Sequence, residues 1–380
     1  MDWELGGMES ETKGLKGLLR GQAVLVVCAI LAVASMALVP PSADYVGYID
    51  VSTLCILFCF MATVAGIGEC NAFKALASGI LHGRSGLLPV CVLLVMLPFF
   101  CSMFITNDVS LITFVPFTFQ VLSMAKATRY VIPVVVLQTV AANLGCMALP
   151  FGSPHNLYMY TYYGMSATDM VLFLAPLLIV GFALLCAMAL MFPRKSVEIS
   201  LEGDSGINSQ ARLAVMLALF AACVLTVLHV IPYWATVVLT VAVVGAVRPR
   251  ALAKVDYSLL LTFICLFVFT GNVSQIDAVG DAMTSMMEFD PMLASVAMSQ
   301  VISNVPAAVL LSGFTDQWQG LLAGVNIGGF GTPIASMASL ISLRLYMRTA
   351  HSDMGRYMAW FTAANVLVLA VLMATYYVVM

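Results

Sequence analysis

Long apolar runs follow one another along most of this 380-residue chain. A helix needs about 20 predominantly apolar residues to cross the hydrocarbon core of a bilayer. Uninterrupted runs near that length predict simple membrane-spanning helices, and these runs are 22–39, 45–67, 168–192, 212–229, 232–247, 256–271 and 357–378. The runs 232–247 and 256–271 are short for a span.

Two further apolar stretches are each divided by a short polar motif. Residues 86–125 form two apolar arms around a Thr-Asn-Asp motif at 106–108. Residues 291–317 form two shorter arms around a Ser-Asn pair at 303–304. Each stretch is predicted to be a re-entrant hairpin that enters and leaves the membrane on one side, with the polar motif at its tip.

Two other stretches are too long for one simple span and are broken in the middle. Residues 130–164 contain the segment LGCMALPFGSPHN, and residues 318–346 contain GVNIGGFGTPIAS. Unwound backbone at membrane depth is tolerated only where it is buried in protein or lines a wet cavity. Both stretches are therefore predicted to be broken membrane helices that cross once.

The positive charges support this topology. With a cytoplasmic tail at 1–21 and a cytoplasmic linker at 193–211, all 16 Lys and Arg residues fall on the cytoplasmic side. That one-sided distribution follows the positive-inside rule. The outer segments carry no basic residue, and their acidic residues are Asp44, Asp277, Asp281, Glu288, Asp290 and Asp316. The prediction is about nine crossings plus two hairpins, a cytoplasmic N-terminus and an external C-terminus.

The same order of elements occurs twice, in transmembrane halves 22–192 and 212–380. Because the first hairpin opens from the cytoplasm and the second from outside, the two repeats are inverted. A constant offset of 183 aligns Asn143, Gly145, Pro150, Ser153 and Leu157 with Asn326, Gly328, Pro333, Ser336 and Leu340. Inverted repeats with interrupted helices are typical of secondary transporters, whose site lies where the breaks meet near the membrane midplane.

Composition excludes several classes of protein. Hydrophobic residues make up 62% of the chain and charged residues 9%, against about 25% charged in soluble proteins. A soluble enzyme, a disordered protein and, with a net charge of −3, a nucleic-acid binder are excluded. The chain shows no HExxH, Gly-x-Ser-x-Gly or P-loop motif, so no enzyme activity and no cofactor are expected. The fold class is an all-α polytopic membrane protein.

Asp108 is the only carboxylate placed well inside an apolar stretch. A mid-membrane acid is costly enough to suggest a functional role. Asp108 is predicted to carry a coupling proton or to ligate Na⁺, for which Asn107 and Asn143 offer further oxygens, while Thr106 and Asn107 contact the substrate. The alternative is that Asp108 caps the second hairpin arm.

The second tip lacks an acid, so one cation site is expected rather than two. Ser303 and Asn304 are predicted to contact the substrate, the latter because it pairs with Asn107. Pro306 suits the first turn of the returning helix, so a plain capping role for Ser303 is the alternative.

The two breaks supply the remaining candidates. Half-helix N-termini present free N–H groups and a positive dipole end, so a site built from them can hold an anion without a buried Lys or Arg. His155 is predicted either to contact substrate or a proton, or to be a structural hydrogen-bonding group. Asn326, like Asn143, is assigned to cation coupling; the other predicted substrate contacts are Ser153, Asn156, Thr332 and Ser336.

Four strings resemble the ion transporter superfamily, in particular its citrate transporter-like branch of anion permeases. They are TNDVSLITFVPF (106–117), LPFGSPHNLYMY (149–160), SNVPAAVLL (303–311) and GVNIGGFGTPIASMASLI (324–341). The resemblance implies a homodimer with scaffold and transport domains, hairpin tips that hold substrate and cation, and elevator-like movement. Sodium-dicarboxylate members carry Ser-Asn-Thr at both tips, whereas an acid after the tip asparagine is similar to arsenite permeases and sodium/proton antiporters.

The resulting prediction is a secondary active transporter in the cytoplasmic membrane. Its substrate is a small anion, with a di- or tricarboxylate such as citrate favoured, coupled to H⁺ or Na⁺. An arsenite or antimonite efflux permease is the alternative, because arsenite is mostly a neutral trihydroxide at pH 7. An ion channel or an intramembrane enzyme is the alternative of another class.

Overall fold

The computed structural model describes residues 23–42, 45–81, 86–196, 207–349 and 352–380. All regular structure in those ranges is helical, which confirms the prediction of an all-α polytopic membrane protein. The predicted cytoplasmic tail 1–21 lies outside the described residues, as do positions 197–206 of the linker.

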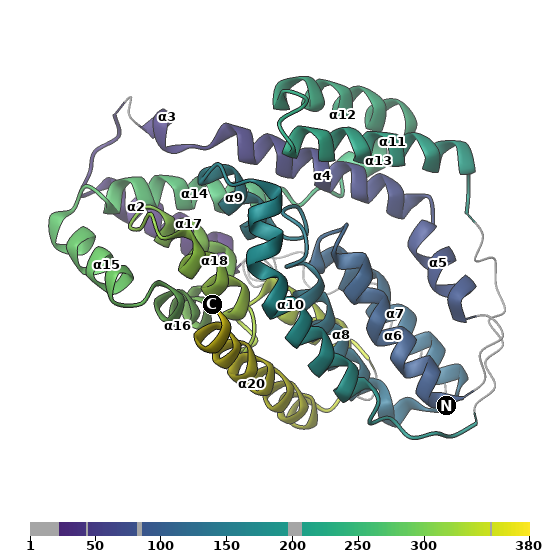
Figure 1. Ribbon diagram of the computed structural model, residues 1–380. Helices are drawn as coiled ribbons and strands as arrows, with labels where there is room; N and C mark the ends of the chain where they lie inside the picture. Colours follow the sequence, from purple (N-terminus) through teal and green to yellow (C-terminus); the bar gives the residue numbers. More distant parts are fainter. Residues whose placement is uncertain (1–22, 43–44, 82–85, 197–206, 350–351) are drawn as a thin grey trace.

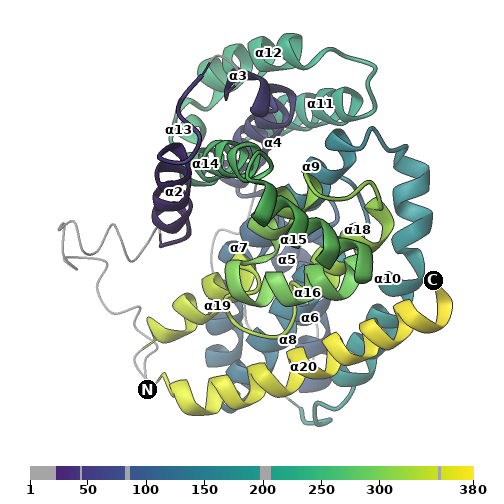
Figure 2. The same ribbon diagram turned by 90° about the vertical axis from the view of Figure 1, so that its left-hand side faces the viewer.

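The helices form two bundles, which Figure 2 separates into an upper and a lower group. The peripheral bundle contains α2 (Ala23–Met36), α3 (Tyr45–Tyr48), α4 (Val51–Glu69), α11 (Gln210–Val227), α12 (Tyr233–Val247), α13 (Pro249–Leu252) and α14 (Tyr257–Val273). The core bundle contains α6 (Leu87–Ser102), α7 (Asn107–Met124), α8 (Val131–Gly145), α9 (Pro154–Tyr162), α10 (Ala167–Ala189), α16 (Pro291–Ile302), α17 (Asn304–Ser312), α18 (Trp318–Ile327), α19 (Met337–Met347) and α20 (Met354–Val379). Between the bundles in the sequence lie α5 (Ala72–Leu81) and α15 (Asp277–Phe289), and the short η1 (Thr128–Tyr130) precedes α8.

Within the described ranges, five helical segments are long and apolar enough to cross a membrane. They are Val51–Glu69, Ala167–Ala189, Gln210–Val227, Pro249–Val273 and Met354–Val379. Shorter apolar helices occur at Val24–Met36, Leu87–Ser102, Tyr233–Val247, Pro291–Ile302 and Met337–Met347. The last group includes the first arm of each predicted hairpin and one half of a broken helix, as expected for elements that do not span alone. It also includes the helices of the predicted spans 22–39 and 232–247, which are shorter in the structure than a simple span requires.

The predicted single span 45–67 is wrong at its start. The structure divides it into α3 and α4, because Asp50 stops one helix and begins the next. An Asp50 carboxylate oxygen accepts a hydrogen bond from the backbone N–H of Thr53 at 3.0 Å, which satisfies one of the free donors at the start of α4.

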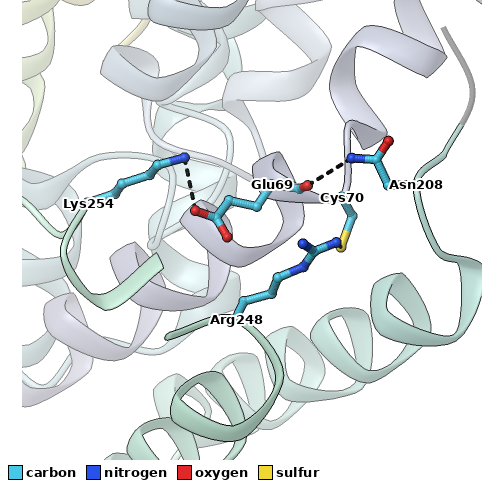
Figure 3. A network of polar contacts seen from close by, with 5 residues as sticks. All are labelled: Glu69, Cys70, Asn208, Arg248 and Lys254. Atoms are coloured by element: carbon cyan, nitrogen blue, oxygen red, sulfur yellow. Dashed lines mark hydrogen bonds and ion pairs between the residues drawn. The ribbon is translucent and has the colours of Figure 1, made fainter. Parts of the chain in front are cut away.

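One edge of the peripheral bundle is tied by polar contacts (Figure 3). The Lys254 ammonium lies 3.0 Å from a Glu69 carboxylate oxygen, and the Asn208 side-chain amide donates to the Glu69 carbonyl at 3.4 Å. The Arg248 guanidinium lies 3.9 Å from the Cys70 sulfur. These contacts join the end of α4 to the segments that flank α11 and α13, so helices from both halves of the chain form one bundle.

Each predicted hairpin packs tightly on the broken helix that follows it. In the first half α6 lies against α8, and in the second half α16 lies against α18. A Cβ built on Gly145 would lie 2.0 Å from the Phe99 carbonyl oxygen and 2.4 Å from the Ser102 hydroxyl. A Cβ built on Gly328 would lie 2.6 Å from the Ser299 hydroxyl oxygen on α16. At Gly145 only glycine permits this approach of backbone to backbone.

We expect Gly145→Ala to destabilise the protein by about 3 kcal/mol, because the new methyl group meets the backbone of α6 rather than a movable side chain. The measurement is thermal unfolding of the purified protein in detergent. Gly245→Ala is the matched control: no atom lies within 4 Å of its Cβ position on α12, so its unfolding temperature should be unchanged or slightly higher. Equal unfolding temperatures for the two variants would contradict the close crossing.

The second arm of each hairpin packs against the broken helix of the other half. Helix α7 contacts α19, and α17 contacts α9. The first hairpin is followed by the break between α8 and α9, and the second by the break between α18 and α19. The exchange of partners therefore brings both tips and both breaks into the middle of the core bundle. The opposite orientation of the two sets across a bilayer stays a prediction.

Candidate functional site

Asn143, in the last turn of α8, joins the first hairpin tip to the second break. Its side-chain oxygen accepts hydrogen bonds from the Asn107 amide at 2.9 Å and from the Ser336 hydroxyl at 3.2 Å. Its side-chain nitrogen lies 3.4 Å from the carbonyl oxygen of Gly329, to which it donates. All three of its partners lie outside its own helix, and two of them belong to the other half of the chain.

The first tip begins α7 with Asn107, after Thr106 at the N-cap position. The Asn107 side-chain oxygen accepts from the backbone N–H of Asp108 at 3.1 Å. Asp108 lies inside the first turn rather than at the cap, so the alternative that it caps α7 is wrong. One of its carboxylate oxygens is buried and has no hydrogen-bond partner among the described residues. A negative charge in the first turn is compatible with the dipole of α7, but that oxygen lacks a donor.

The second tip is held by the break that faces it. The backbone N–H of Asn304 donates to the Ala335 carbonyl at 2.9 Å, and the Ser303 hydroxyl lies 3.4 Å from the same oxygen. Ser303 is buried and has a φ of +76°, a strained backbone for a residue with a side chain. Ser303 occupies the N-cap position of α17, as the capping alternative predicts, but its side chain makes no capping hydrogen bond to that helix.

Asn304 reaches the same region as Asn107. Its side-chain nitrogen would lie 3.0 Å from a Cβ built on Gly329, the residue whose carbonyl oxygen accepts from Asn143. Asn107 binds the other end of the Asn143 amide. Asn304 therefore lies beside Gly329 directly, and Asn107 is linked to the same unwound segment through the Asn143 side chain; both tip asparagines are buried.

Asn326, at the end of α18, joins the second break to the first break in the same way. Its side-chain nitrogen donates to the Asn156 side-chain oxygen at 2.7 Å and to the Leu322 carbonyl at 2.9 Å. Its side-chain oxygen lies 3.3 Å from Nε2 of His155, which is also 3.3 Å from the Ser153 hydroxyl. As with Asn143, the asparagine of one break binds residues of the other break.

Ser153, His155 and Asn156 are buried at the start of α9. The Ser153 hydroxyl caps this helix by accepting from the backbone N–H of Asn156 at 3.4 Å, so it has a structural role. The Asn156 side chain donates to the Cys146 carbonyl at 3.1 Å across the break. The Nδ1 atom of His155 is buried and has no partner in the described part of the chain.

Thr332 does not join the asparagine cluster. It is exposed, its backbone N–H donates to the Gln300 side-chain oxygen at 2.9 Å, and its hydroxyl donates to the Gln300 carbonyl at 3.2 Å. Gln300 also donates to the carbonyl oxygens of Gly328 and Phe330, at 2.8 and 3.0 Å. Gln300 therefore holds the unwound second break in place. Sequence reasoning missed it, although a glutamine within an apolar hairpin arm was a signal.

Eight helix ends meet around this asparagine cluster. The N-termini of α7, α9, α17 and α19 begin at residues 107, 154, 304 and 337, and the C-termini of α6, α8, α16 and α18 end at residues 102, 145, 302 and 327. N-termini favour negative charge and C-termini favour positive charge. Among the described residues, no group of three His, Cys, Asp or Glu side chains could hold a metal ion. The arrangement can thus hold an anion and a cation side by side without fixed basic groups.

The family model of citrate transporters (CitMHS) matches residues 15–317 of the chain. The chain belongs to the citrate transporter family. It is 31% identical over 257 residues to an uncharacterized transporter of Methanocaldococcus jannaschii, covering 67% of this chain and 70% of that protein. It is 26% identical over 310 residues to the inner membrane protein YbiR of Escherichia coli, covering 78% and 80%.

An uncharacterized transporter of Mycobacterium tuberculosis is 23% identical over 344 residues, with 79% of each protein covered. The family membership confirms the resemblance to citrate transporter-like permeases. Together with the apolar helices, it shows that this protein is an integral membrane protein of a transporter family.

Proposed function

We propose that the protein is a secondary active transporter of a small anion, with a di- or tricarboxylate such as citrate as the favoured substrate. The observation that carries the proposal is the Asn143 side chain, whose three hydrogen bonds connect the first tip with the second break. Paired interrupted helices that meet in this way are the usual frame of a transporter site. Family membership independently favours citrate-like cargo.

The anion is held by the four helix N-termini that begin at the cluster. Their free N–H groups and dipoles supply the positive potential that a buried Lys or Arg would supply in a soluble protein. The side chains nearest these N-termini are Thr106, Asn107, Ser153, Ser303, Asn304 and Ser336. Amides and hydroxyls can donate to carboxylate oxygens without the large desolvation cost of a fixed charge.

The coupling cation binds at Asp108. Its unpartnered buried oxygen can take up a proton or bind Na⁺ together with neighbouring carbonyl and amide oxygens. The Asn143 oxygen already accepts two hydrogen bonds, and the Asn107 oxygen accepts one. The carboxylate is therefore the principal negative group available, and a single cation site follows.

Transport by this arrangement requires the two bundles to move past each other. The core bundle carries both tips and both breaks, and the peripheral bundle contacts it through the pairs α4–α9 and α14–α17. We propose an elevator-like displacement of the core bundle, in a homodimer held by the peripheral bundles. In the cytoplasmic membrane the two halves form inverted repeats with re-entrant hairpins, an inner N-terminus and an outer C-terminus.

Counterflow in proteoliposomes tests the substrate. Vesicles loaded with unlabelled citrate, succinate or arsenite receive the same labelled compound outside. We expect labelled citrate or succinate to accumulate transiently above the level in protein-free vesicles. Accumulation of arsenite alone would favour the efflux permease, for which the absence of Lys or Arg contacts in the described cluster is the supporting observation. No accumulation of any of the three would overturn both proposals.

A further inference from the structure

A cavity of about 520 Å³ lies where the two bundles meet, away from the asparagine cluster. Helix α17 forms one wall of the cavity and packs against both α9 and α14 (Figure 1). The volume lies within the range of sites for small molecules. The lining comes from the segment 47–50 and from α9, α14 and α17, and its polar members are Tyr48, Asp50, Tyr158, Thr161, Tyr162, Thr270, Ser274 and Ser312.

The charge of this cavity is predominantly negative. Among the described lining residues, Asp50 is the only carboxylate, and none is Lys, Arg or His. Three helices end there, α9 at Tyr162, α14 at Val273 and α17 at Ser312, against one that begins there, α4 after Asp50. Each C-terminus carries about half a negative charge. The cavity therefore repels anions and favours a cation.

Aromatic side chains supply the walls. The Tyr48 ring lies directly over Gly271 of α14, so close that a Cβ there would be 2.5 Å from a ring carbon. The Tyr158 hydroxyl lies 2.6 Å from the Ser312 hydroxyl, which ties α9 to α17 on the other side. Phe267 and Tyr162 complete the aromatic lining. Aromatic faces together with a carboxylate form the setting in which quaternary ammonium groups bind through cation–π attraction.

We propose that this cavity is a binding site for a small organic ammonium cation, separate from the transported anion's site. The positive head lies between the Asp50 carboxylate and the rings of Tyr48 and Tyr162, the lining aromatic side chains that are not buried. Because α3, Asp50 and α14 belong to the peripheral bundle and α9 and α17 to the core bundle, the bound cation contacts both bundles at once.

Equilibrium binding to the purified full-length protein tests the proposal. The probes are choline and its neutral isostere 3,3-dimethylbutan-1-ol, measured by titration calorimetry in a neutral detergent. We expect choline to bind at least about tenfold more tightly than the isostere, since the shapes match and only the charge differs. Equal binding of the two compounds, or binding of neither, would overturn the proposal.

The matched variants are Asp50→Asn and Asp277→Asn. Asparagine caps a helix about as well as aspartate, so Asp50→Asn keeps the start of α4 and removes the charge. The Thr53 hydroxyl, which donates to the second carboxylate oxygen, can accept from the new amide instead. We expect it to weaken choline binding at least about tenfold and to leave the unfolding temperature nearly unchanged. Asp277 is exposed on α15 and does not line the cavity, so its variant should bind like the parent. Undiminished binding by Asp50→Asn would refute the site.

The ammonium group could belong to a free amine or to a lipid headgroup. Nanodiscs of phosphatidylcholine and of phosphatidylglycerol distinguish the two sources. If choline binds more weakly in phosphatidylcholine nanodiscs than in phosphatidylglycerol nanodiscs, the lipid headgroup competes for the site and is its ligand. If choline binds equally in both, the ligand is a free amine. These measurements need no transported substrate, so their outcome is independent of the counterflow result.

Discussion

We expect Asp108→Asn to abolish cation-driven accumulation of labelled citrate while the protein stays folded. The substituted amide resembles the protonated carboxyl group in shape but can neither release a proton nor give a cation its negative charge. Accumulation in proteoliposomes with an imposed proton or sodium gradient should fall to the level of protein-free vesicles. Exchange of citrate without a gradient should persist, because the variant resembles one loaded state of the carrier.

The control for this variant is Asp169→Asn. Asp169 also lies in the first turn of a helix, α10, but it is exposed and remote from the asparagine cluster. Its variant should accumulate citrate normally. If Asp108→Asn retained the pH and Na⁺ dependence of the parent, the coupling role of Asp108 would be refuted. Altered ion selectivity with undiminished flux would indicate a channel instead of a carrier.

The second largest effect is expected from Asn143→Ala, because the Asn143 side-chain amide makes hydrogen bonds to three partners. Its removal leaves the Asn107 amide, the Ser336 hydroxyl and the Gly329 carbonyl without their hydrogen bonds. A buried polar group left unpaired costs about 1–3 kcal/mol. We expect the affinity for citrate, measured by calorimetry, to fall at least about tenfold, since 1.4 kcal/mol corresponds to a factor of ten.

Asn365→Ala provides the comparison. Asn365 is as deeply buried as Asn143, but its amide donates only to Phe361 within its own helix, α20. This variant should lower the unfolding temperature slightly and bind citrate like the parent. Similar citrate affinity in both variants would show that the Asn143 contacts have no part in the site.

The order of elements and the polar tips could be predicted from the sequence because they rest on local patterns. A polar motif between two apolar arms, or a Gly-rich break in a long apolar run, ends a helix wherever it occurs. The structure accordingly ends helices at Ser102 and Ile302 and at Gly145 and Ile327. Burial of Asn107, Asn143, Asn304 and Asn326 follows from the same patterns.

The pairing of side chains could not be predicted, because it depends on contacts between distant parts of the chain. Thr332 was selected for its polarity, yet it faces Gln300 and lies exposed. The polarity of Gln300 within an apolar arm could have marked it, but its three partners in the second break could not be predicted, because they are backbone groups. Asp50 likewise interrupts an apolar run that hydropathy alone reads as one span.

The exchange of helices between halves has a consequence for biosynthesis. Helix α7 packs against α19 as well as against α6 and α8, and α9 packs against α17, so these first-half helices also contact partners made more than 140 positions later. While only the first half has been synthesised, the side-chain amide of Asn143 therefore lacks its second-half partners Gly329 and Ser336. The asparagine cluster can therefore be completed only after the last broken helix has been made.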